Sequence, residues 1–183
     1  MTLEEMFDQA FATAVQDRRD LIRFLEGVSE TQARWKPPDG EWSILEGLEH
    51  IMLTEERFRT LMLKTLREAE ASGRWDNAPP RPVKMSLETL RRREQGFVPA
   101  PEELLPRGAG RFAQMIQELI PARQATREAF LPYRSRDLSR LVPPPGRYGD
   151  LNLYERIAYS GIHDALHREQ MERVTRQPGF PRE

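Results

Sequence analysis

The sequence contains no cysteine among its 183 residues. That absence excludes disulfide bonds, thiolate metal sites, iron–sulfur clusters and a cysteine nucleophile. Long apolar runs are also absent, and nothing approaches the ~18 uninterrupted apolar residues of a membrane span. The first residues carry neither a basic leader nor an apolar run, so we expect no signal peptide. These absences predict a soluble, cytoplasmic protein that makes no use of a membrane.

The chain has little excess of charge of either sign. Lysine and arginine number 28 and aspartate and glutamate 29, for a formal net charge of −1. Nucleic-acid binders usually carry a basic excess, because neutralising phosphates drives their affinity. The run Arg91-Arg92-Arg93 stands beside Glu88 and Glu94, which favours a solvated helix face. We therefore expect no nucleic-acid partner.

Proline-rich segments divide the chain. A chain of 183 residues is most simply one domain, here spanning residues 1–183. Proline cannot continue a helix, so the runs read as loops. They fall at residues 35–40, 77–82, 97–101 and 142–146.

Apolar residues recur at three- and four-residue spacing between these loops, whereas no alternating pattern typical of a strand occurs. The spacing predicts an all-α protein, a four-helix bundle with long Pro-rich connections. A shorter helix is expected over about Leu87–Gln95, and one turn at Glu102–Leu105. The long connections permit crossovers and leave the helix order open. The four long helices are expected at Leu3–Leu25, from Ser43 to about Leu66, at about Arg111–Leu131, and from Asn152 to about Gln177.

The chain has only three histidines. His163 and His167 are four residues apart, so their side chains lie one turn apart on the same, inward face of the last helix. His50 lies on the second long helix at the flank of its apolar stripe, where the small Gly47 is expected to leave room beside the imidazole. Metal sites in bundles are built from facing helices. The placement predicts that the three imidazoles close on one divalent cation.

Three neutral ligands would leave such a cation its full charge and at least one open position, as in catalytic sites. A bound water would be acidified there, or a substrate thiol held as thiolate. By itself, a His-x-x-x-His pair is weak evidence, because such histidines often pack or face solvent. Asp164 follows His163 where the metalloprotease signature needs glutamate, which disfavours that class.

Two segments carry a resemblance to a known family. The first, from Trp35 to His50, contains a Pro-Pro-Asp-Gly loop, a Trp-Ser-Ile helix start and the first histidine. The second, from Gly149 to Gln170, ends in His-x-x-x-His-x-x-Gln. Both resemble the DinB-like (DinB/YfiT-like) superfamily, four-helix bundles with a three-histidine metal site. The resemblance implies His50, His163 and His167 as the metal ligands.

The resemblance also implies a function. Members bind zinc, nickel, iron or manganese, and the imidazoles alone do not select among them. Known activities include transfer with low-molecular-weight thiols, and some members are described as metal-dependent hydrolases; many are homodimers. It implies a metal-dependent thiol S-transferase or hydrolase that acts on a small electrophilic substrate. A non-catalytic metal-binding or stress-response bundle is the alternative, and a metal-free interaction bundle is a third reading.

Two carboxylates are weak catalytic candidates. Glu46 lies one turn before His50 and could orient it or act as a base, although a capping box with Ser43 is the simpler role. Asp164 could serve the site, but adjacent helix residues diverge by ~100°. Solvent or a salt bridge with Arg168 is at least as good an explanation of Asp164.

Other polar and aromatic side chains have simpler roles. Gln170, three residues after His167, is expected to hydrogen-bond near the site. Arg57 could receive an anionic substrate, but a solvated helix charge is the usual case. Packing, with a pocket wall as the minor option for the tryptophans, explains the remaining aromatic candidates, which are Trp35, Trp42, Tyr154 and Tyr159.

Overall fold

A computed structural model describes residues 1–83, 100–144 and 150–182. In these ranges the regular structure is helical, without a strand, as the sequence predicts. The elements are α1 (Leu3–Leu25), α2 (Glu30–Arg34), α3 (Ile44–Ala71), α4 (Arg74–Asn77), η1 (Glu102–Leu104), α6 (Phe112–Phe130), η2 (Leu131–Tyr133), η3 (Leu138–Arg140) and α7 (Leu153–Val174).

Side-chain caps explain where three of the long helices begin. Thr2, Ser43 and Asn152 each accept from the amide of the glutamate three residues on, and each glutamate answers with a bond to the cap amide. These capping boxes satisfy amides that the first helical turn leaves free. They confirm the predicted starts at Ser43 and Asn152. α6 lacks such a cap and continues through Pro121.

The lengths of the elements differ from expectation in places. α3 continues past the end of its apolar stripe to Ala71. The five-residue α2 and four-residue α4 were not expected, because elements this short have no periodic signature. The turn expected at Glu102–Leu105 is the 3₁₀ turn η1. The expected helix at about Leu87–Gln95 lies outside the described residues.

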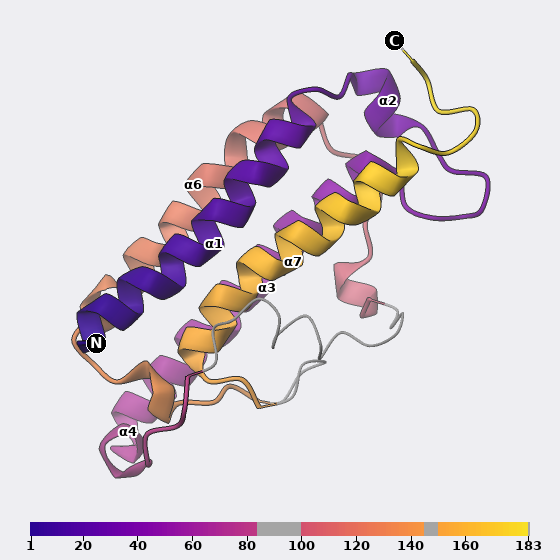
Figure 1. Cartoon of the computed structure of the whole chain (residues 1–183). Helices are drawn as coiled ribbons and strands as arrows, with labels where there is room; N and C mark the ends of the chain where they lie inside the picture. The colour runs from indigo at the N-terminus through magenta and orange to yellow at the C-terminus, as the bar shows by residue number, and fades with distance from the viewer. Residues whose placement is uncertain (84–99, 145–149, 183) are drawn as a thin grey trace.

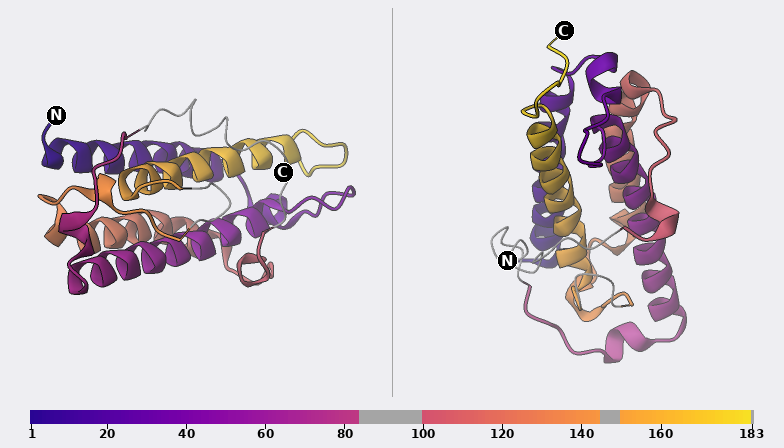
Figure 2. Two further views of the ribbon diagram at one scale, coloured as in Figure 1. Left: turned by 90° about the horizontal axis from the view of Figure 1, so that it is seen from below. Right: turned by 90° about the vertical axis from the view of Figure 1, so that its right-hand side faces the viewer.

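The four long helices form two layers, α1 with α7 and α3 with α6 (Figure 2). Two apolar clusters show the direction of each helix, since one lies at each end of the bundle (Figure 1). α1 and α7 run one way, and α3 and α6 run the other. The first cluster includes Phe7, Leu66, Phe130 and Leu153, and the second includes Leu25, Ile44, Phe112 and Val174.

The directions of α3 and α6 determine the course of the connection between them. α3 ends at one end of the bundle and α6 begins at the other, so the chain has to return from one end to the other between Ala71 and Phe112. With 1.5 Å of rise per residue, the 28 residues of α3 extend ~42 Å. The returning chain places η1 against α3. That contact lies beside His50.

Between the two apolar clusters lies a layer of buried charge. Arg18, Glu55, Arg123 and Asp164, one from each long helix, are all at most 5% exposed. None of the described helices is both long and apolar enough to cross a membrane.

α1 and α7 approach each other closely at Gly161. A Cβ added there would lie 2.7 Å from the Cα of Ala14, 2.9 Å from Oδ2 of Asp17 and 3.1 Å from the carbonyl oxygen of Thr13. Two of these three atoms belong to the backbone of α1, so a larger residue would push the helices apart. Glycine is therefore required at this contact.

We predict that Gly161→Ala lowers the free energy of unfolding by roughly 1–3 kcal/mol, the usual cost of overpacking. Urea unfolding followed by circular dichroism measures the change. Gly27→Ala is the matched control, because its Cβ would meet only the carbonyl of Phe24, at an ordinary 3.5 Å. Equal stability of the two variants would contradict the close packing of α1 on α7.

Candidate metal centre

The three histidines converge between α3 and α7. One ring nitrogen from each of His50, His163 and His167 lies within 4.8 Å of the other two. The ring centroids are 4.5 Å apart for His163 and His167, 4.8 Å for His50 and His167, and 5.3 Å for His50 and His163. In the part of the chain that the structure describes, they form the one such group of potential metal ligands.

Hydrogen bonds fix which nitrogen two of the rings present to the centre. Nδ1 of His50 lies 2.8 Å from the carbonyl oxygen of Leu104, which can only accept, so Nδ1 carries the proton. Nδ1 of His167 lies 3.0 Å from Oε1 of Gln170. This contact confirms the expected role of Gln170. Nε2 is therefore the nitrogen of both rings that can coordinate a ligand, an arrangement usual for metal-binding histidines.

The spacing of the nitrogens fits a cation. Nε2 of His163 and Nε2 of His167 are 3.2 Å apart. Two nitrogens each ~2.0–2.1 Å from one tetrahedral ion would be ~3.3 Å apart. The donor set is also suitable, because imidazole binds zinc, iron and nickel alike.

His163 is held in its neutral, ligating form. Burial lowers the pKa of His163 well below its ordinary value, and the neighbouring His167 and His50 lower it further. The guanidinium groups of Arg18 and Arg123 act in the same direction. A neutral imidazole has the free lone pair that coordination needs.

Aromatic rings enclose the imidazoles. The Trp42 ring stacks on His167 at 6.1 Å and lies 4.8 Å from His50. Phe58 lies 6.0 Å from the ring of His163. Trp42 was expected mainly to cap the core, and the structure instead places it as a wall of the site. Of the other aromatic candidates, Trp35 packs against Phe180 and Tyr154 lies in the first apolar cluster. Tyr159 packs with Leu151 and Ile162, and its ring lies 6.5 Å from that of His163.

Two polar groups at the site were not predicted from the sequence. The hydroxyl of Thr54 is buried and lies 3.4 Å from Nε2 of His50. Its position one turn after His50 is a signal that could have found it. The Leu104 carbonyl has no such signal, because every residue carries one.

Gly47 does not serve the imidazole as expected. A Cβ at Gly47 would lie 2.8 Å from Cε of Met171, so the glycine makes room for that methionine in the core. Gly47 and His50 both face α7, but Gly47 lies about one turn earlier on α3. Gly47 therefore meets Met171, whereas His50 meets His163 and His167.

Asp164 belongs to the buried charge layer, so the expectation of solvent or of a bridge to Arg168 is wrong. Its oxygens accept from Nε and Nη2 of Arg18, at 2.7 and 2.9 Å, and from Nη2 of Arg123 at 3.1 Å. Asp164 is directed away from the imidazoles because it lies ~100° around the helix from His163. Arg168 pairs with Glu172 instead.

Glu55 completes the layer. It accepts from Nη2 of Arg18 at 3.1 Å, from Nε of Arg123 at 3.0 Å and from the hydroxyl of Thr126 at 2.6 Å. Two carboxylates thus balance two guanidinium groups. The signal for this layer was Arg18, whose four- and three-residue spacing from Ala14 and Leu21 places a charge inside the apolar stripe of α1.

The remaining candidates lie outside the imidazole cluster. Oε2 of Glu46 accepts from the amide of Ser43 at 2.7 Å and from Nζ of Lys36 at 2.6 Å, as the capping role predicts. Burial opposes ionisation of Glu46, but Lys36 and Ser43 outweigh it and lower its pKa. Arg57 is more than half exposed and pairs with Glu103 at 3.2 Å.

Comparison with known proteins agrees with this geometry. The family model described as the DinB superfamily matches residues 13–171. YuaE of Bacillus subtilis (strain 168), itself described as uncharacterized, is 25% identical over 153 residues, which cover 82% of this chain and 87% of YuaE. No solved structure matches the chain.

The buried charges predict acid lability of the metal-free protein. Burial opposes ionisation of Glu55, but Arg123 and Arg18 outweigh it and lower its pKa. The unfolded chain, with an ordinary pKa near ~4.3, therefore binds more protons in acid. The free energy of unfolding should fall as the pH drops below about 5. Urea unfolding at several pH values in the presence of a chelator measures this.

Glu55→Gln should lose roughly 3 kcal/mol at neutral pH, since it leaves two buried guanidinium groups to share the single carboxylate of Asp164. Its stability should also depend less on acid than that of the wild type. Glu172→Gln, at a half-exposed i,i+4 pair, is the control and should change little. If the free energy of unfolding of Glu55→Gln depended on acid pH as strongly as that of the wild type, Glu55 would not be the cause of the acid lability.

Proposed function

The chain belongs to the DinB superfamily, and from this membership and the converging imidazoles we propose that it is a metal-dependent enzyme. The proposed reaction is the transfer of a low-molecular-weight thiol to a small electrophile. The observation that supports it most is the convergence of the three histidines, with Nδ1 of His50 and of His167 engaged by hydrogen bonds so that Nε2 of these rings is the nitrogen that can bind a cation. His50, His163 and His167 would hold the metal.

A divalent cation in this position supplies Lewis acidity, which lowers the pKa of a bound thiol or water. The protein contributes orientation and exclusion of water. Trp42 and Phe58 present apolar faces beside the imidazoles, and such walls strengthen electrostatic interactions within a site. The Thr54 hydroxyl can donate to a ligand held beside His50.

Hydrolysis is the alternative reaction, since the same acidified position would activate water. Neither chemistry requires Glu46 or Asp164, whose carboxylates are engaged by Lys36 and by the two buried arginines. A homodimer that binds a small-molecule substrate remains the expected assembly.

We predict near-stoichiometric divalent metal in the tag-free protein, measured by plasma mass spectrometry. His163→Ala and His167→Ala should each lose it, because two imidazoles hold a cation much more weakly than three. Arg168→Ala, on the surface of the same helix, is the control and should keep the metal. A metal content independent of both histidines would refute the site.

Catalytic activity should require the bound metal. The metal-loaded protein should join low-molecular-weight thiols to a chromogenic aryl chloride, with release of chloride, and His50→Ala should abolish the reaction. Hydrolysis of activated esters without thiol transfer would instead support the hydrolase. Stoichiometric metal with neither activity, together with a melting temperature several degrees lower after chelation, would identify a non-catalytic metal-binding bundle.

A further inference from the structure

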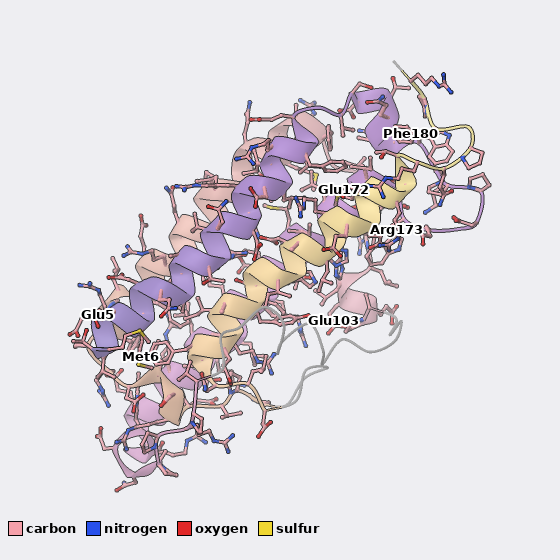
Figure 3. The ribbon with its side chains drawn as sticks, in the orientation of Figure 1. Glu5, Met6, Glu103, Glu172, Arg173 and Phe180 are labelled. Carbon is pink, nitrogen blue, oxygen red and sulfur yellow. The ribbon has the colours of Figure 1, made fainter. Side chains whose placement is uncertain are left out.

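The returning connection lies directly against the metal centre. We call residues 101–111 the η1 strap, since it contains η1. Figures 1 and 3 show it beside the middle of α3, with Glu103 labelled on it. The carbonyl oxygen of Leu104 accepts the 2.8 Å hydrogen bond from Nδ1 of His50. The strap therefore supplies the group that sets the proton position of one proposed ligand.

Glu49 anchors the strap from the residue next to that ligand. Its Oε2 accepts from the amide of Arg107 at 2.7 Å and from the amide of Gly108 at 2.6 Å. Successive amides can point at one anion when the second residue adopts a left-handed conformation. Gly108, with φ of +65°, does so.

Arg34 holds the strap from its other side. Its Nη1 donates to the carbonyl oxygen of Gly108 at 3.3 Å and its Nη2 to that of Gly110 at 2.9 Å. The pair between Arg57 and Glu103 adds an exposed contact, of the kind that contributes little. Of these contacts, only that of Glu49 combines a carboxylate with two short backbone bonds.

We propose that Glu49 is a positioning residue of the metal centre. It acts through the η1 strap, holding the Leu104 carbonyl against His50 so that the imidazole keeps one orientation and one tautomer. The inference rests on the proposed function only in that His50 binds a cation. Glu49 itself is not a member of the ligand cluster, because it lies ~100° around α3 from His50.

The effect should be measurable as metal affinity. A free imidazole exchanges tautomers and rotates, and binding must then fix both. Outer hydrogen-bond partners of metal-binding histidines change metal affinity by 10–100-fold in other proteins. An anchor one step further out should have an effect at the lower end of that range.

The test compares variants of the full-length chain. Zn²⁺ affinity is measured by competition with a chromogenic chelator, and Co²⁺ absorption reports the ligand geometry. Glu49→Gln should weaken Zn²⁺ binding about tenfold and alter the Co²⁺ spectrum. Gly108→Ala should act in the same direction, because its left-handed backbone is strained by any side chain. Together, the two changes should weaken binding less than the product of their separate effects.

Glu103→Gln is the matched control. It removes a carboxylate from the same strap but no backbone anchor, so its affinity should stay within twofold of the wild type. Wild-type affinity in both Glu49→Gln and Gly108→Ala would overturn the inference while leaving the site intact. A wild-type protein that binds no Zn²⁺, and so behaves like His163→Ala, would refute the proposed function itself.

Discussion

The rest of the structure depends on the buried layer formed by Arg18, Glu55, Arg123 and Asp164. Each long helix contributes one charge, and each charge finds partners only when all four helices are in register. Removing one partner from such a layer costs several kcal/mol, whereas apolar contacts can slide at lower cost. The layer thus specifies how the helices align, and the apolar clusters on either side supply most of the hydrophobic burial.

This alignment also brings together the three histidines of the candidate metal centre. His163 and Asp164 are neighbours on α7, and their ~100° divergence sends one side chain toward His50 and the other toward the arginines. The same arginines disfavour a proton on His163, so the layer that orders the bundle also keeps a proposed ligand neutral. The same buried charges thus align the helices and keep His163 neutral. A substitution in the layer should therefore also affect the imidazoles.

The order of the helices supplies the third component. α3 and α6 run in the same direction, so the chain between them must return along the bundle. That return brings Leu104 to His50 and places two strap amides on Glu49. A bundle in which every helix ran opposite to the one before it would need only a short turn there, and His50 would lack this partner.

The sequence by itself determined the all-α class, the starts of the long helices and the pairing of His163 with His167, because capping boxes and helical periodicity are local. It also indicated His50, through residues that resemble a family. Only the tertiary structure decided the role of Asp164, whose partner Arg18 is 146 residues away in sequence. The same holds for the contacts of Trp42 and for the Leu104 carbonyl. Such contacts depend on helix order and rotation, and a backbone oxygen leaves no mark in the sequence.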